Sequence, residues 1–348
     1  DVGIAKELID KYNCGNIVSY DENELANIMY NYIINFKNKE NFNVCNEFDI
    51  NSELEKTLAI IEATIDLNDT KTKIKILPYP AESIDYEELE KYTIKKDLTY
   101  VLSVIKDKIN YEYLINFKSD NDKLIIFNNG AVAGGNVKVP VFQRHSWANI
   151  LKTSSILVMD PTLYNGDLSI GWGIGKNNNY YLENSSLILR KIIEKMNIKS
   201  NQTVIYGTSA GGYLSIIMGI YLKGSYVVAD NAQLDITNWA FIDAVNNVIE
   251  YSFDNIASAL EYPERFNVID AFIKNNYVPK IYLHVNACSS VDNSMQLIPF
   301  LQKLEKMKNV DSYNNIEIIL HYEPNKGHDG LSQGEALNFI YNLLNIEN

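Results

Sequence analysis

Positive charge is scarce in this sequence, and arginine is almost absent. The 348 residues include 31 Lys and Arg against 44 Asp and Glu, which gives a net charge of -13 at pH 7. The only arginines are Arg144, Arg190 and Arg265. Sequence-independent binding to the nucleic-acid backbone needs clustered positive charge. We therefore expect no nucleic-acid partner.

Cysteine is also rare, and long apolar runs are missing. Cys14, Cys45 and Cys288 are odd in number and far apart, with no C-x-x-C spacing that would indicate a zinc or redox pair. We expect reduced thiols in a cytoplasmic protein. No apolar run approaches the roughly eighteen residues of a membrane span. The sequence begins at Asp1 without a Met, so a preceding domain stays open.

The sequence does have enough apolar residues for a large core. Hydrophobic residues make up 46% and aromatic residues 11% of the chain, which excludes a disordered or fibrous protein. Residues 1–110 predict a mixed helical and strand region with an accessory role in binding substrate or partner. Within it, apolar spacing predicts helices at 23–36 and 51–66, and a charged helix from Tyr86 to Lys108 follows a break at Pro78 and Pro80.

Residues 111–348 predict a catalytic domain of the α/β class. From residue 123 on, short apolar strands end in loops of small residues and precede helical stretches. Such β-branched runs suit strands buried on both faces, so we expect a mostly parallel sheet flanked by helices, with functional loops at the carboxyl ends of its strands. The expected strands are 124–128, 155–160, 203–207, 226–230, 280–286 and 316–322, and the expected helices are 183–196, 210–221, 293–307 and 333–344.

The sharpest motif is Gly207-Thr208-Ser209-Ala210-Gly211, which fits G-x-S-x-G between an apolar strand and a helix. A nucleophile elbow needs a strand, a turn too tight for flanking side chains, and a helix whose N-terminus points at the reacting centre. The glycines give the clearance, and the amide of Ala210 with the helix dipole favours an oxyanion. We predict that Ser209 is a nucleophile. The alternative is a glycine-rich turn with an ordinary N-cap serine.

A serine nucleophile needs a base, and the chain contains four histidines. His284 and His321 lie inside apolar strands, where a core imidazole with satisfied hydrogen bonds is expected. His145 precedes the elbow and lies in a loop. His328 lies in the glycine-flanked sequence NKGHDG, after the last strand and before the last helix. We therefore predict that His328 is the base.

The acid that orients the base should follow a strand between the elbow and the histidine. Asp292 lies a short loop beyond the strand that ends near residue 286. Asp230 and Asp235, beyond the strand 226–230, are its rivals, and we favour Asp292 over both. Asp329 is adjacent to the predicted base and is better explained as a helix N-cap.

Two further loops are candidates for binding substrate. The loop 128–135 is rich in small residues, so we predict that Gly130 or Ala131 supplies a second oxyanion N–H; the alternative is a flexible surface turn. Arg144 is a candidate clamp for an anionic sugar or a phosphate-bearing carrier, or else a structural arginine that ties its loop to an acidic neighbour. Trp172, with Lys176, is predicted to lie in a loop that covers the substrate, with a surface excursion as the alternative.

From about residue 123 to the end, the chain resembles serine α/β-hydrolases. GTSAGG is similar to the elbow of carbohydrate and small-ester acetylesterases, and the order Ser209, Asp292, His328 matches that of the superfamily. The strings FNNGAVAGG, VFQRHSW, ILVMDPTL, GWGIG, YGTSAGGYLS and ADNAQLD also resemble α/β-hydrolase-like proteins of bacterial capsular polysaccharide biosynthesis. That group includes O-acetyltransferases, which pass an acyl group from the serine to a sugar hydroxyl.

These observations predict a serine-dependent esterase or O-acyltransferase that acts on a carbohydrate ester, with an acyl donor as a further partner if the reaction is a transfer. A rival prediction is a non-catalytic accessory protein of surface-polymer or glycoprotein biosynthesis or export that uses the fold for binding. A metal hydrolase and a nucleotide-binding transferase are disfavoured, because their ligand and phosphate-loop motifs are missing. We expect no cofactor, and the oligomeric state stays open.

Overall fold

The structure is a computed structural model that describes residues 79–132, 139–165, 168–305, 307 and 315–347. The chain divides into two units between Pro78 and Tyr79, and the described residues belong to the second. The helices expected at 23–36 and 51–66 lie outside the described residues.

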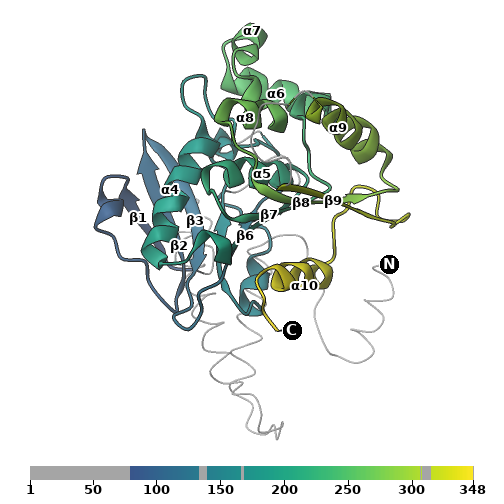
Figure 1. The fold of residues 1–348 in the computed structure, drawn as a ribbon. Helices are drawn as coiled ribbons and strands as arrows, with labels where there is room; N and C mark the ends of the chain where they lie inside the picture. The colour runs from purple at the N-terminus through teal and green to yellow at the C-terminus, as the bar shows by residue number, and fades with distance from the viewer. Residues whose placement is uncertain (1–78, 133–138, 166–167, 306, 308–314, 348) are drawn as a thin grey trace, which may run out of the picture. The chain divides into compact units, whose positions relative to one another are not determined.

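The described residues form a nine-stranded sheet in the order β1-β2-β3-β5-β4-β6-β7-β8-β9 (Figure 1). The strands from β5 and β4 to β9 are parallel, so the predicted α/β fold class is confirmed. Strands β4 and β6 are almost wholly buried, as their apolar sequences require. The bounds are β1 Ala81–Asp85, β2 Thr99–Lys106, β3 Ile109–Asn116, β4 Leu124–Asn128, β5 Ser154–Val158, β6 Thr203–Thr208, β7 Tyr226–Asp230, β8 Lys280–Asn286 and β9 Ile316–His321.

The charged helix expected from Tyr86 to Lys108 is wrong. This stretch contains only a short 3-10 turn, Glu88–Glu90, before β2, which forms an antiparallel hairpin with β3. Asp107 and Lys108, between the two strands, have φ values of 53° and 64°, as a tight two-residue hairpin turn requires. The apolar run Val101–Val104 is buried between its sheet neighbours, and its β propensity outweighs the charges around it. The expected domain boundary at residue 110 falls inside this hairpin.

The helices of the parallel half agree largely with the prediction. They are α4 Tyr181–Met196, α5 Ala210–Tyr221, α9 Ile298–Leu304, which follows a π-helical turn Asp292–Leu297, and α10 Gln333–Leu343. Sequence analysis missed three helices between β7 and β8, which are α6 Ile242–Ser252, α7 Ile256–Leu260 and α8 Val268–Asn275. Figure 1 shows α6, α7 and α8 on one side of the sheet and α10 on the other.

The strand order places a topological switch point at β4. The chain passes from β4 to β5 on one side and then returns to β6 on the other side of β4. In open α/β sheets the loops diverge at such a point and leave a crevice outside the carboxyl ends of the strands. The loop of Gly130 and the elbow of Ser209 follow β4 and β6, so the fold brings these two predicted site elements together.

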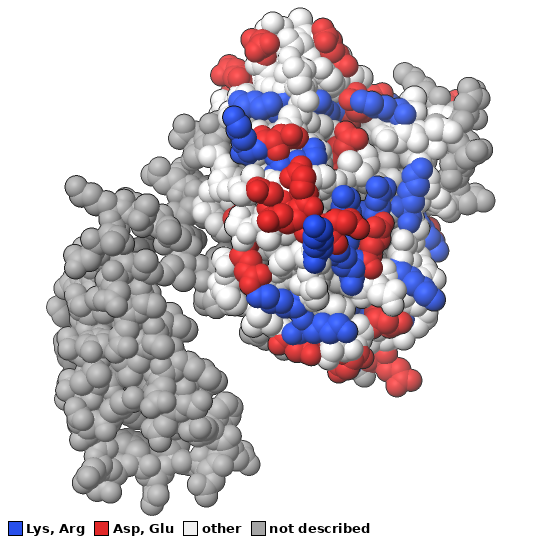
Figure 2. All heavy atoms as spheres, turned by 90° about the vertical axis from the view of Figure 1, so that its left-hand side faces the viewer, with Lys and Arg blue, Asp and Glu red and all other residues white. Residues whose placement is uncertain are grey.

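On the face drawn in Figure 2, basic and acidic side chains are interspersed over the surface that carries the β1–β3 edge of the sheet. No broad area of one sign covers the described part of this face. Nucleic-acid backbones bind to continuous basic surfaces, and this face offers none.

Candidate active site

The elbow has the tight geometry that its glycines predict. Ser209, between β6 and α5, has φ 56° and ψ -123°, a conformation that L-residues rarely adopt. A Cβ on Gly207 would lie 2.2 Å from the carbonyl oxygen of Gly211, and a Cβ on Gly211 would lie 2.7 Å from the carbonyl oxygen of Asn128. Larger residues at either position would therefore force the strand and helix apart. The backbone thus presents the Ser209 side chain at the end of β6.

Ser209, His328 and Asp292 form one hydrogen-bonded line. The Ser209 hydroxyl lies 2.9 Å from His328 Nε2, and His328 Nδ1 lies 2.7 and 2.9 Å from the two carboxylate oxygens of Asp292. Asp292 is 2% exposed and also accepts a 2.5 Å hydrogen bond from the Ser289 hydroxyl. This arrangement fixes Nδ1 as the protonated nitrogen and leaves Nε2 free to accept the serine proton.

The Trp239 ring covers the imidazole of His328. Their centroids lie 5.0 Å apart, and Trp239 is itself 8% exposed. Trp239 lies directly before α6, in the segment between β7 and β8 that sequence analysis did not resolve. The segment between β7 and β8 therefore packs against the predicted base through Trp239.

Neither rival carboxylate contacts His328. Asp230 is fully buried and accepts a 2.6 Å hydrogen bond from the Leu331 N–H, and burial raises its pKa. Asp235 caps the turn Ile236–Asn238 and bonds to Asn267 and Lys303.

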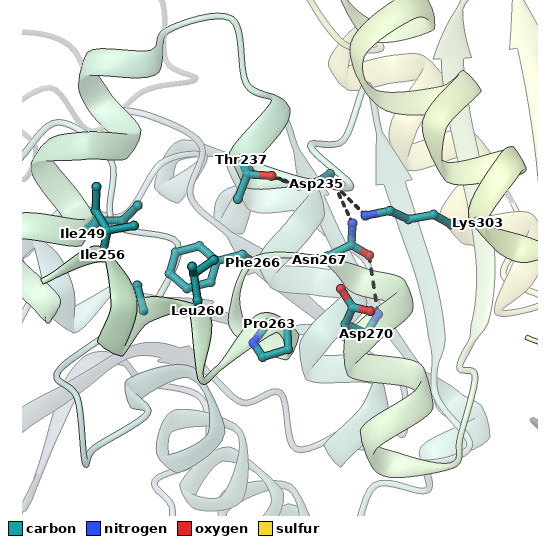
Figure 3. Close-up of a pocket in the computed structure, with 11 residues that line it drawn as sticks. Asp235, Thr237, Ile249, Ile256, Leu260, Pro263, Phe266, Asn267, Asp270 and Lys303 are labelled. Atoms are coloured by element: carbon teal, nitrogen blue, oxygen red, sulfur yellow. Dashed lines mark hydrogen bonds and ion pairs between the residues drawn. The ribbon is translucent and has the colours of Figure 1, made fainter. Parts of the chain in front are cut away.

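Asp235 lines a cavity of about 210 Å³ among α6, α7 and α8, with Lys303 of α9 on its polar side (Figure 3). None of Ser209, His328 and Asp292 lines this cavity. Asp230 and Asp235, the two rivals of Asp292, therefore form hydrogen bonds with groups other than His328.

Two asparagines hold the loop of His328 in place. Asn231 Nδ2 donates to the carbonyl oxygens of His328 and Asp329 at 3.3 and 2.9 Å. Asn286 is fully buried, and its Nδ2 donates at 2.9 Å to the carbonyl oxygens of Glu323 and Gly327. Sequence analysis missed both residues, because asparagine is abundant throughout this chain. Asn231 directly follows β7 and Asn286 is the last residue of β8, and these places at the ends of buried strands are the only sequence signal.

The structure distinguishes the two oxyanion candidates after β4. The N–H of Gly130 donates at 2.9 Å to Gln143 Oε1, and Gln143 Nε2 donates at 2.9 Å to the carbonyl oxygen of Ala131. Gln143 thus clamps this loop and occupies the Gly130 N–H. Among the described residues no hydrogen bond engages the N–H of Ala131, nor that of Ala210 at the N-terminus of α5. Ala131 and Ala210 therefore remain as the free donors.

Trp172 does not lie over a surface site. Its side chain is fully buried, and its indole N–H donates to Gln233 Oε1. Gln233, also fully buried, donates from Nε2 to Ser209 Oγ at 3.1 Å. Trp172 has φ 48°, in the left-handed region that non-glycine residues seldom adopt. Sequence analysis missed Gln233, although it lies in the string ADNAQLD that carries the family resemblance.

Arg144 lies beside the elbow. Its guanidinium donates to Thr208 Oγ1 at 2.8 Å and to the Asn128 carbonyl oxygen at 3.4 Å, and it lies over the rings of Trp147 and Tyr206. The structure thus places a positive charge against Thr208, the residue that precedes Ser209, and the hydrogen bonds that hold it go to neutral groups rather than to an acidic neighbour.

The remaining histidines lie apart from the elbow serine. His145 Nδ1 lies 3.3 Å from the Tyr79 hydroxyl. His284 is 5% exposed and packs edge-on against Phe339, and burial lowers its pKa to about 4. His284 Nε2 and both ring nitrogens of His321 lack hydrogen-bond partners among the described residues. The prediction that His284 and His321 are core imidazoles with satisfied hydrogen bonds is therefore wrong for both.

Among the described residues, no group of three or more His, Cys, Asp and Glu side chains is arranged to hold a metal ion. The same part of the chain contains no helix that is long and apolar enough to cross a membrane.

No protein-family model and no curated protein matches the chain. Solved structures do match it. A capsule O-acetyltransferase of Neisseria meningitidis serogroup A is 12% identical, with a TM-score of 0.51, over 69% of this chain and 96% of that chain. The Glycosylation Associate Protein (Gap123) complex from Streptococcus agalactiae is 14% identical, with a TM-score of 0.50, over 69% of this chain and 45% of that chain.

At these identities the comparisons show the fold. The chain has an α/β-hydrolase-like fold, which agrees with the fold that the resemblance in its sequence implies. An acetyl xylan esterase 1 from Thermoanaerobacterium sp. also matches, at 12% identity and a TM-score of 0.49, over 72% of this chain and 85% of that chain.

Proposed function

We propose that this chain is a serine-dependent esterase or O-acyltransferase that works through an acyl-enzyme. The observation that carries the proposal is the line from Ser209 Oγ to His328 Nε2 and from His328 Nδ1 to Asp292, with every distance below 3 Å. The strained backbone of Ser209 supports it, because such strain persists where the surroundings impose it and clusters at active sites.

Each residue has a role in this proposal. His328 takes the proton from Ser209 while Oγ bonds to the acyl carbon, and it then gives that proton to the departing alcohol. Asp292 holds the imidazole and stabilises its charged form. The N–H groups of Ala210 and Ala131 bind the oxygen that becomes negative in the tetrahedral intermediate. Water or a second hydroxyl then attacks the acyl-enzyme by the reverse sequence.

We propose a carbohydrate ester as the substrate class. The support is the resemblance of the elbow to carbohydrate acetylesterases, together with structural neighbours named as a capsule O-acetyltransferase and as a glycosylation-associated complex. Arg144 would then bind an anionic group of the sugar or of its carrier, since a guanidinium suits carboxylate and phosphate. A cytoplasmic location stays a prediction from the cysteine pattern.

Intact-mass analysis tests the proposal. The protein is incubated with a serine-directed fluorophosphonate and, separately, with an activated acetyl ester, and Ser209→Ala serves as the control. We expect one adduct on the native protein, lost in the variant, and a burst of product with the ester. A folded native protein that neither reacts nor shows a burst would favour the rival, a non-catalytic binding module.

A further inference from the structure

We propose that the side-chain amide of Gln233 is a catalytic hydrogen-bond donor to the nucleophile oxygen of Ser209. The inference rests on the proposed role of Ser209. It adds to His328 a second side chain in direct contact with the reacting oxygen.

The geometry joins Gln233 to Ser209 twice. Gln233 Nε2 lies 3.1 Å from Ser209 Oγ, and the backbone N–H of Gln233 donates to the Ser209 carbonyl oxygen at 3.2 Å. Because the backbone bond fixes the position of the Gln233 main chain, its side chain can reach only a small volume around Oγ. A fully buried glutamine that faces a nucleophile in this way is preorganised for it.

Trp172 determines which end of the amide faces Ser209. An amide oxygen and nitrogen are hard to distinguish by shape, and their assignment follows from their partners. An indole N–H can only donate, and Trp172 Nε1 bonds to Oε1 of Gln233. Nε2 must therefore be the atom directed at Ser209, and it can only donate. The full burial of both side chains excludes water as a substitute partner.

The hydrogen bonds at Oγ are compatible with catalysis. A serine hydroxyl has one proton and two lone pairs. The proton goes to His328 Nε2, and one lone pair accepts from Gln233 Nε2. When His328 removes the proton, partial negative charge develops on Oγ in the transition state, and it passes to the carbonyl oxygen as the bond from Oγ to the acyl carbon is completed. A donor at Oγ stabilises that charge, and Gln233 keeps both of its amide protons throughout.

The test compares two buried glutamines. Gln296 is 1% exposed, and its Oε1 accepts from the N–H groups of Leu234 and Asp235 at 2.8 and 2.9 Å, in the same loop as Gln233. Both of these hydrogen bonds go to backbone groups, and neither involves Ser209. Gln233→Glu and Gln296→Glu therefore make the same chemical change in neighbouring buried positions, and only the first alters the group that faces the nucleophile.

The measurement is the rate constant of Ser209 labelling by a fluorophosphonate from pH 4.5 to pH 8.5, relative to the native protein. For Gln233→Glu we expect this ratio to fall at least tenfold as pH rises, because a protonated Glu can donate whereas an ionised one repels the charge on Oγ. For Gln296→Glu the ratio should stay flat. Gln233→Met should lose about 100-fold at every pH, the size expected for one lost donor at a developing charge.

Thermal unfolding of each variant at each pH shows whether a slower labelling rate comes from lost stability. The double variant Trp172→Phe with Gln233→Met removes both hydrogen-bond partners, so that no buried indole N–H is left unpaired. The inference is overturned if the native protein labels at Ser209 while folded Gln233→Met labels equally fast, or if both Glu variants give flat ratios. Failure of the native protein to label would instead refute the proposed function itself.

Discussion

The loops that carry Ser209 and His328 are held in place by different means. The serine side, residues 207–211, is held mainly through its backbone. Ser209 has φ 56°, its N–H donates to the Asp230 carbonyl oxygen at 3.1 Å, and glycines let the strand and helix approach. On the histidine side, side chains of neighbouring loops hold the backbone, chiefly Asn231 and Asn286.

This difference decides what a sequence reveals. A backbone requirement leaves a mark such as G-x-S-x-G, because only glycine fits where a Cβ would lie within 3 Å of another backbone. A buried amide leaves no such mark, since asparagine occurs at many positions of this chain for unrelated reasons. The two sides nevertheless meet at one 2.9 Å hydrogen bond between Ser209 and His328.

The strongest test of the comparison removes one reacting side chain from each side. Ser209→Ala and His328→Ala should each lower kcat by at least about 1,000-fold, and the double variant should lose no more, because the two act as a unit. His145→Ala is the control and should retain kcat, since its contact is with Tyr79. Substantial turnover by folded Ser209→Ala on its true substrate would refute the assignment of the nucleophile.

The acid comes next in expected effect. Asp292→Asn should lower kcat by about 100-fold or more while sparing the most reactive serine probes, because an amide can still hold the ring but favours the wrong tautomer. Asp230→Asn and Asp235→Asn should lose much less in side-by-side kinetics, since their bonds go to Leu331 and to Asn267 and Lys303. A larger loss in either variant would place the acid one strand earlier.

The amide side chains of Asn286 and Gln143 each hold one loop of the site, so that each loop can be weakened separately. Asn286→Leu should lower the melting temperature, and it should lower kcat roughly tenfold, because it leaves two part-buried carbonyl oxygens of the histidine loop without their donor. Gln143→Leu should reduce kcat by a smaller factor without a change in melting temperature, since the loop it clamps at Gly130 and Ala131 is partly exposed to water. The reverse pattern in thermal unfolding would contradict the comparison.

Acid should lower the stability of the fold through His284, which lies in β8. Burial lowers its pKa to about 4 from 6.5, so folding favours the neutral ring; the stabilisation is complete above pH 6.5 and is lost as pH falls toward 4. The loss amounts to about 3 kcal/mol over that window. His284→Leu should remove this part of the slope in denaturant unfolding at pH 4 to 7. Parallel curves for the two proteins would show that His284 does not contribute.

The parts of the fold and site that the sequence predicts are those marked by apolar runs or by a backbone requirement for glycine. The parallel strands, α5, the elbow and the loops of Asp292 and His328 follow from apolar runs and glycines. Strand β2 falls within the stretch predicted as a charged helix, because charges surround its apolar residues, and its pairing with β3 outweighs that local signal. Gln233 and Gln143 could not be predicted, since each becomes significant only through a partner distant in the sequence.

Substitution of Arg144 should have the smallest effect on kinetics, and it tests whether a residue bonded to the elbow also binds the substrate. Its guanidinium is bonded to Thr208, the residue before the nucleophile, and packs on Tyr206, so its position is fixed. If it binds an anionic substrate, Arg144→Lys should raise KM several-fold for that substrate and leave a small neutral ester nearly unchanged, because lysine keeps the charge but loses the two-pronged donor. Equal losses on both substrates, with a melting temperature low enough to explain them, would assign Arg144 to the scaffold that supports β6.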